Sequence, residues 1–96
     1  MYIVFMEFES DPAKEAKNLE KHGVDFSTIP AAFTDPKRIL QPNRGHSSTE
    51  SRFQCIGFDG IDVLTFTFTL RAGVVRVINA GYWRRGRKFY EKENKK

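Results

Sequence analysis

The sequence predicts an α+β fold in a single domain over residues 1–96: an antiparallel β-sheet meander with two N-terminal helices and a C-terminal helix. Three observations predict this class. Capping residues bound a helical pattern early in the chain, the second half alternates apolar and polar residues with a period of two, and Asp-Gly and Ala-Gly pairs separate the alternating segments. A chain of 96 residues has room for one domain with a modest core.

The composition favours a folded protein with an anionic partner. Hydrophobic residues make up 40% of the chain and aromatic residues 14%, which is enough apolar material to fold without metals or disulfides. Lysine and arginine total 16 against 12 acidic residues, a net charge of +4, and the segments RRGRK and KENKK place the excess after residue 70. Such a surface attracts nucleic acid or an acidic protein; the alternative is a basic tail that serves solubility alone.

Cysteine and histidine usage argues against a disulfide or a metal site. Cys55 is the only cysteine, and two histidines without a cysteine cluster form no recognisable metal-binding pattern. The apolar run YIVFMEF near the N-terminus has no basic segment before it, which argues against a signal peptide or a membrane span. We therefore expect a cytoplasmic protein with no cofactor and no membrane partner.

The N-terminal quarter predicts a strand over residues 2–9 and then a helix. Asp11 is the expected N-cap, Pro12 the first helical residue and Gly23 the residue that ends the helix. On a helical wheel, one face is apolar and is expected to pack, whereas the opposite face is cationic and is expected to meet solvent. The apolar face consists of Pro12, Ala13, Ala16 and Leu19, and the cationic face of Lys14, Lys17, Asn18 and Lys21.

Two further helices and a loop are expected. The second helix is predicted to follow Ser27 as its N-cap and to end at Asp35, which precedes a proline. Residues 41–50 have almost no apolar content and are predicted to form a mobile loop. A final helix is expected over residues 84–94, although Gly86 weakens it.

The register of the predicted meander depends on its two turns. A two-residue turn at Asp59-Gly60 places Gln54 opposite Thr65 and Arg52 opposite Thr67. The core face then contains Phe53, Cys55, Leu64, Phe66 and Phe68.

The second turn, at Ala72-Gly73, is expected to pair Arg71 with Val74. This register sets Arg76 beside Thr69, whereas a slip by one residue would bury an unpaired charge.

A polar strip on one sheet face follows from this register. Arg52 and Arg76 are expected to flank Thr65, Thr67 and Thr69, and guanidinium and hydroxyl groups together suit a phosphate. The alternative is an ordinary solvated face of an antiparallel sheet.

Aromatic and basic residues also alternate near the C-terminus, in a pattern that suits base stacking beside a cationic track. The residues are Tyr82, Trp83 and Tyr90, with Arg84, Arg85, Arg87 and Lys88. The alternative is that Trp83 anchors the core.

The two histidines differ in their expected surroundings. His22 falls at the C-terminal end of the first helix, where the helix dipole favours its protonated form; the alternative is that it caps or packs against that end. His46 falls in the predicted loop, where it could move onto a substrate or simply be solvated.

Three stretches of the chain resemble the BrnT family of type II toxins. FESDPAKEAKNLEKHGVDF, from Phe8 to Phe26, is similar to the opening F-E-W-D-x-x-K-x-x-x-N-x-x-K-H-G-x-x-F of the family. FTDP followed by ESRFQCIG is similar to F-x-D-P and E-x-R-x-x-x-I-G, and Leu70-Arg71 with RVINAGYW is similar to R-x-I-S-A-R-x-A. The resemblance implies a fold similar to RelE-type microbial ribonucleases and a toxin that blocks translation by cutting RNA. It also implies a BrnA-type antitoxin that neutralises the toxin and binds operator DNA.

The resemblance and the polar strip together suggest roles for individual residues. Arg52 and Arg76 are expected to hold the phosphate, and Lys14 and His22 to assist proton transfer or charge stabilisation without a metal. Further RNA contacts are expected from Arg71, Thr67, Thr69, Arg84 and Arg85.

Four positions depart from the family pattern. Ser10 replaces a usual Trp, Asn79 a Ser, Gly81 an Arg and Arg87 a Glu. The loss of the arginine at 81 motivates the alternative of a catalytically impaired homologue that acts as an antitoxin-binding corepressor module.

Overall fold

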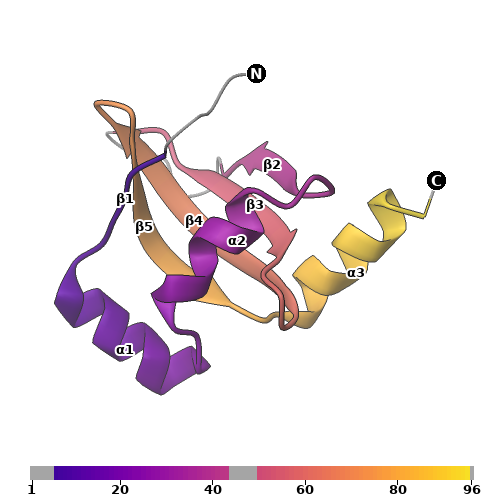
Figure 1. The fold of residues 1–96 in the computed structure, drawn as a ribbon, viewed down its shortest axis with the longest axis horizontal. Helices are drawn as coiled ribbons and strands as arrows, with labels where there is room; N and C mark the ends of the chain where they lie inside the picture. Colours follow the sequence, from indigo (N-terminus) through magenta and orange to yellow (C-terminus); the bar gives the residue numbers. More distant parts are fainter. Residues whose placement is uncertain (1–5, 44–49, 96) are drawn as a thin grey trace.

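The structure is a computed structural model that describes residues 6–43 and 50–95. Its five strands form one sheet in the order β1-β5-β4-β3-β2 (Figure 1). The strands are β1 (Phe8–Glu9), β2 (Ile39–Pro42), β3 (Phe53–Phe58), β4 (Val63–Arg71) and β5 (Val74–Gly81), and the helices are α1 (Pro12–His22), η1 (Phe26–Thr28), α2 (Ile29–Phe33) and α3 (Arg84–Glu93).

The sheet is mixed, so the expectation of a purely antiparallel sheet was wrong. β1 lies parallel to β5, with Phe8 opposite Val75 and Glu9 opposite Arg76. The other strand pairs are antiparallel. A hairpin turn forces two strands to pair antiparallel. Helices and other strands separate β1 from β5 in the chain, so β1 could pair with β5 in either direction. Of the predicted first strand, residues 2–5 lie outside the described part of the chain.

Helix α1 begins and ends where the sequence predicts. The Asp11 carboxylate accepts a hydrogen bond from the Ala13 N–H at 2.9 Å, and Gly23 ends the helix with a φ of 68°. The predicted packing face was wrong, because Leu19 is 51% exposed whereas Asn18 is buried. The other apolar residues of that face, Pro12, Ala13 and Ala16, are also exposed.

The segment after α1 differs from the expected single helix. Asp25 accepts a hydrogen bond from the Ser27 N–H and starts the short 3₁₀ helix η1, so α2 begins only at Ile29. Strand β2 was not predicted, because four residues ending in a proline carry little strand signal. β2 pairs with β3 at the edge of the sheet. His46 lies outside the described residues.

The β3–β4 turn is wider than the two-residue turn that was expected. Phe58 pairs with Val63, so four residues form the loop. Asp59 shapes it, since its carboxylate accepts hydrogen bonds from the N–H groups of Ile61 and Asp62 at 2.8 and 3.0 Å. The strands are therefore shifted by two residues from the predicted register, with Gln54 opposite Thr67. An even shift leaves every side chain on its predicted face.

The β4–β5 hairpin has the predicted register. Arg71 pairs with Val74 and Thr69 with Arg76, across a turn in which Ala72 and Gly73 both have positive φ. Val75, beside Arg76 in β5, is fully buried and points to the other face of the sheet. Further along, a β-bulge between Thr67 and Phe68 leaves one extra residue in β5.

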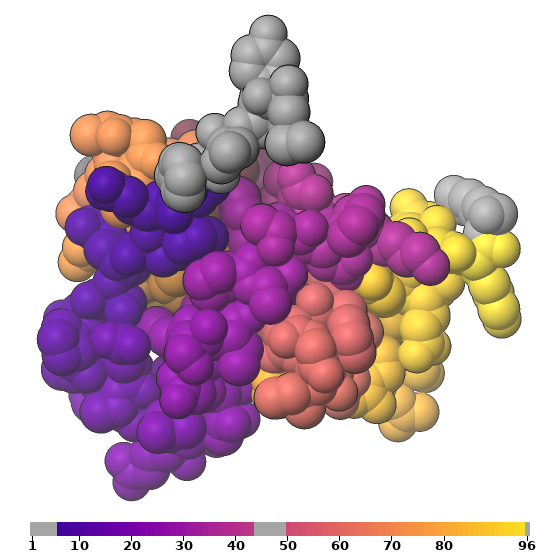
Figure 2. Space-filling view, viewed as in Figure 1, coloured from indigo at the N-terminus to yellow at the C-terminus, as the bar shows by residue number. Residues whose placement is uncertain are grey.

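Helix α2 covers one face of the sheet and closes the core. A Cβ atom at Gly57 would lie 2.2 Å from the Ala32 carbonyl oxygen, so the helix rests directly on β3. In the space-filling view, the purple and magenta atoms of this region lie over the strands (Figure 2). The core cluster contains Val24, Phe26, Ile29, Ala32, Cys55, Leu64, Phe66, Phe68, Val75, Val77 and Ala80.

Helix α3 packs on the opposite face of the sheet. Thr65 points away from the core residues Leu64 and Phe66, and a Cβ atom at Gly86 would lie 2.0 Å from its hydroxyl oxygen. Gly86 therefore permits a close approach of helix and strand rather than only weakening the helix. No helix in the described part of the chain is long and apolar enough to cross a membrane.

Candidate functional site

The sheet face that carries α3 contains three rows of side chains across β3, β4 and β5. The residue pairs between β3 and β4 and between β4 and β5 define two of the rows. Arg52, one residue before β3, would lie opposite Thr69 if the β3–β4 register continued by one residue. The rows are Arg52-Thr69-Arg76, Gln54-Thr67-Asn79 and Ile56-Thr65-Gly81. One end of the face is thus cationic, and the other end is covered by α3.

Three arginines and two carboxylates meet at the cationic end, and we call them the arginine cluster. Arg71 donates two hydrogen bonds to Glu50 at 2.8 and 3.2 Å, and Arg76 forms an ion pair with Glu9 at 3.0 Å. The hydrogen bond from Arg71 holds the pKa of Glu50 below its usual value, and the charges of Arg52 and Arg76 act in the same direction. Among the described residues, the Arg52 guanidinium has no ion-pair partner.

The threonines of this face are buried, so the expected exposed strip was wrong in that respect. Thr65, Thr67 and Thr69 are 3%, 5% and 1% exposed. They lie on β4, the central strand of the sheet, and α3 packs on Thr65 at Gly86. The hydroxyls of Thr65 and Thr69 have no hydrogen-bond partner among the described residues.

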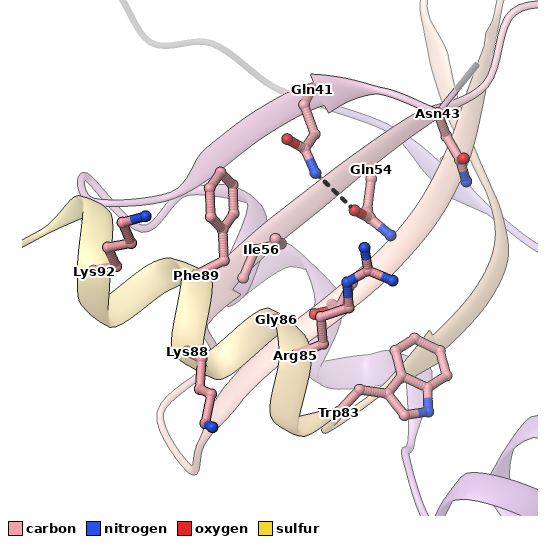
Figure 3. A pocket seen from close by; sticks show the side chains of 11 residues that line it. Gln41, Asn43, Gln54, Ile56, Trp83, Arg85, Gly86, Lys88, Phe89 and Lys92 are labelled. Carbon is pink, nitrogen blue, oxygen red and sulfur yellow. Dashed lines mark hydrogen bonds between the residues drawn. The ribbon is translucent and has the colours of Figure 1, made fainter. Parts of the chain in front are cut away.

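A groove of about 850 Å³ lies between α3 and the polar sheet face (Figure 3). One wall is formed by cationic side chains of α3, and the floor by amides of the strands, where Gln41 donates a hydrogen bond to Gln54 at 2.9 Å. Figure 3 shows the Arg85 guanidinium near the Gln54 side chain. The residues that line the groove are Gln41, Asn43, Gln54, Ile56, Thr65, Trp83, Arg85, Gly86, Lys88, Phe89 and Lys92.

Trp83 links this groove to α1. Its ring meets the His22 ring edge to face, with centroids 5.2 Å apart and an interplanar angle of 77°. Trp83 is 37% exposed, so it is not the core anchor that was the alternative expectation. His22 thus contacts a residue that lines the groove but does not line the groove itself.

Two of the predicted site residues lie apart from both groups. Lys14 is exposed on α1, and in the described part of the chain it forms no ion pair or side-chain hydrogen bond with the arginine cluster. Arg84 is the exposed first residue of α3 and does not line the groove.

Two departures from the family pattern have separate structural partners in this chain. Arg87 forms an ion pair with Asp62 of the β3–β4 loop. Gly81 lies against Trp83, because a Cβ atom there would be 2.5 Å from the indole ring.

Sequence reasoning missed the acidic and amide members of the site. Glu50 precedes Arg52 by two residues, a spacing that places both on one side of an extended chain, and this signal could have found it. Glu9 and Asn79 are brought in only by the strand pairings. No group of three or more His, Cys, Asp or Glu within residues 6–43 and 50–95 could hold a metal ion.

Comparison with protein families identifies a family model that matches most of the chain. A family model described as "Ribonuclease toxin, BrnT, of type II toxin-antitoxin system" matches residues 11–86 of the 96-residue chain. The matched stretch runs from the N-cap of α1 to Gly86 and includes most of the arginine cluster. A comparison with curated proteins finds no match.

Proposed function

Because this chain belongs to the BrnT family of ribonuclease toxins of type II toxin-antitoxin systems, we propose that it is a metal-independent endoribonuclease that inhibits translation. The observation that carries the proposal is the arginine cluster, in which three guanidinium groups gather around Glu50 on an accessible sheet face. Clustered guanidinium groups suit the extra negative charge of a pentacoordinate phosphate.

Arg52 and Arg76 are the proposed phosphate ligands. Arg52 directly precedes β3 and Arg76 lies on β5, the two strands that flank β4 at Thr69, so a phosphate above Thr69 would meet both. The Arg76–Glu9 pair is partly exposed, and such pairs contribute little stability, so a phosphate oxygen can replace the carboxylate. Arg71 supplies a third cation in the same way.

Glu50 is the proposed general base for attack by the RNA 2′-hydroxyl. The carboxylate is ionised at neutral pH and can accept a proton, and the hydrogen bond from Arg71, which lowers its pKa, makes it a weaker base while that bond lasts. Once Arg71 turns to the phosphate, the hydrogen bond that lowers the Glu50 pKa is lost, and the carboxylate becomes a stronger base.

His22 and Lys14, which were expected to assist the chemistry, receive supporting roles. His22 contacts Trp83, so we assign it to positioning that ring beside the groove. Lys14 is exposed on α1 and adds to the positive field that attracts RNA.

A cognate antitoxin of the BrnA type is the proposed protein partner, with operator DNA bound only through that antitoxin. The exposed face of α1 offers it a surface, since Leu19 and its apolar neighbours are not covered by the rest of the described chain. Lysines at 17 and 21 flank this face and would attract acidic side chains of the partner.

A second candidate function is a corepressor module that binds the antitoxin without cutting RNA. It is favoured by the pairing of Arg71 and Arg76 with carboxylates, because paired arginines are partly neutralised.

Expression of the chain alone in bacteria separates the two functions. We expect growth arrest and loss of cellular RNA with the wild type, and neither with Glu50→Gln at equal levels of folded protein. Arrest without RNA loss would contradict the ribonuclease, and equal toxicity of both proteins would remove Glu50 from the site.

A further inference from the structure

Trp83 presents an aromatic surface to the groove from the start of α3. It is 37% exposed and is the residue directly before the helix, where its side chain makes no capping hydrogen bond. A tryptophan that served only the core would have a larger part of its side chain buried, because its ring is large and apolar and contributes much of the buried area in a small protein.

Two neighbours hold the indole ring in place. A Cβ atom at Gly81 would lie 2.5 Å from both Cε2 and Cζ2 of Trp83, so the ring rests against bare backbone that only glycine provides. The His22 ring meets it edge to face from α1. The ring is therefore fixed from two sides before any ligand arrives, which lowers the entropic cost of binding.

The rest of the groove supplies the complements of a nucleotide. Arg85, Lys88 and Lys92 line it with positive charge, while the amides of Gln41 and Gln54 offer hydrogen-bond donors and acceptors. Figure 3 shows Trp83 at one end of this groove, on the same side as Arg85. Aromatic rings beside cationic side chains are the usual means by which proteins bind unpaired bases next to their phosphates.

We propose that Trp83 is a stacking platform for one unpaired base of single-stranded RNA, and that Gly81 is the residue that allows it. This inference rests on the proposed function, because it takes RNA as the substrate. In this arrangement, the groove along α3 binds the part of the RNA next to the cleaved bond, and the arginine cluster binds the phosphate at that bond. An acidic peptide would need only the cations, whereas a paired duplex has no free base face to offer.

The emission of Trp83 tests the proposal directly, because this chain contains a single tryptophan. The probe is a short single-stranded 2′-O-methyl oligonucleotide, which lacks the nucleophile for cleavage. We expect saturable quenching of the emission by this probe, and no quenching by a duplex or by polyglutamate. Equal quenching by polyglutamate would overturn stacking.

Variants separate stacking from folding. We expect Trp83→Leu to weaken binding of the labelled probe roughly tenfold or more, and Trp83→Phe to weaken it less. Gly81→Ala is expected to displace the ring, to shift its emission and to weaken binding, although it removes no group that touches RNA. Phe58→Leu is the matched control, since Phe58 is 47% exposed and does not line the groove.

The outcomes distinguish this inference from the proposed function. If natural RNA is cleaved while folded Trp83→Leu and Gly81→Ala bind the probe like the wild type, stacking is wrong and the ribonuclease stands. If the probe quenches Trp83 but natural RNA stays intact, the groove binds RNA and the cleavage proposal fails. If the wild type binds no probe at low salt, the inference is overturned.

Discussion

The side-chain amide of Asn18 pairs with the backbone of Ala80 in both directions. Its Nδ2 donates to the Ala80 carbonyl at 2.8 Å, and its Oδ1 accepts from the Ala80 N–H at 3.1 Å. At this point β5 has β4 on one side only, because β1 ends at the level of Arg76. Asn18 therefore takes the place of a neighbouring strand and fixes α1 against the edge of the sheet.

Replacement of Asn18 should destabilise the fold. Asn18→Ala leaves the N–H and the carbonyl of Ala80 without partners, which should lower the free energy of unfolding by about 2 to 4 kcal/mol. Urea denaturation followed by circular dichroism measures the change. Lys17→Ala, at the exposed neighbouring position, is the control and should leave stability unaltered. Equal midpoints for both variants would show that the amide does not hold α1.

Gly86→Ala should also destabilise the protein, against the usual preference of helices for alanine. The new Cβ atom would meet the Thr65 hydroxyl at 2.0 Å, so helix α3 must move away from β4. We expect a loss of about 1 to 3 kcal/mol in a denaturant titration. Thr65→Ala should recover part of this loss in the double variant. A more stable Gly86→Ala protein would mean that α3 does not rest on β4.

Thr69→Val tests whether the Thr69 hydroxyl contacts RNA. The hydroxyl is buried without a partner in the described part of the chain, so an isosteric methyl group should leave stability equal or raise it by about 1 kcal/mol. RNA cleavage by the purified variant should match the wild type. A loss of cleavage at unchanged stability would return this hydroxyl to the site, as the sequence led us to expect.

Stability should fall at both extremes of pH because of two tyrosine–aspartate pairs. Burial and the hydrogen bonds to Asp59 and Asp35 raise the pKa of Tyr82 and of Tyr90 to about 12. The contribution of these two tyrosines to the free energy of unfolding is complete below about pH 10 and is lost as the pH rises toward 12. Burial by itself raises the pKa of each aspartate, but hydrogen bonds from backbone N–H groups and from the tyrosines outweigh it, so both values lie below normal.

Because their pKa values are lower in the folded state, the ionised aspartates stabilise the fold above about pH 4. This contribution is lost as they are protonated in more acidic solution. Urea denaturation over a pH series measures both limbs. Tyr82→Phe and Tyr90→Phe should flatten the alkaline limb relative to the wild type. An alkaline slope unchanged in both variants would contradict the assignment.

Local signals in the sequence predicted the ends of α1 and the register of the β4–β5 hairpin. Asp11, Gly23 and the Ala72-Gly73 turn act on residues next to them, so their effect can be deduced without the fold. The register at Asp59 was missed because its side chain bonds two backbone groups and widens the turn. The parallel β1 was missed because its partner is distant in the chain.

The site was predictable only in part. Arg52 and Arg76 were placed on one face, since alternation along a strand survives a shift of two residues. Burial of the threonines depends on the central place of β4 in the sheet and on the packing of α3, which no local pattern contains. Asn18 was assigned to the solvent face because a helical wheel ranks residues by polarity, whereas here a polar amide satisfies the open edge of β5. Similarity of the whole fold to RelE-type ribonucleases stays a prediction.

Incubation of the purified protein with RNA in the presence of EDTA tests the central claim most directly. We predict cleavage that persists in the chelator and leaves 2′,3′-cyclic phosphate and 5′-hydroxyl ends, as attack by the 2′-hydroxyl requires. Folded Arg52→Ala and Arg76→Ala should each cleave about a hundredfold more slowly. Intact RNA after incubation with the folded wild type, or cleavage that EDTA abolishes, would contradict the account.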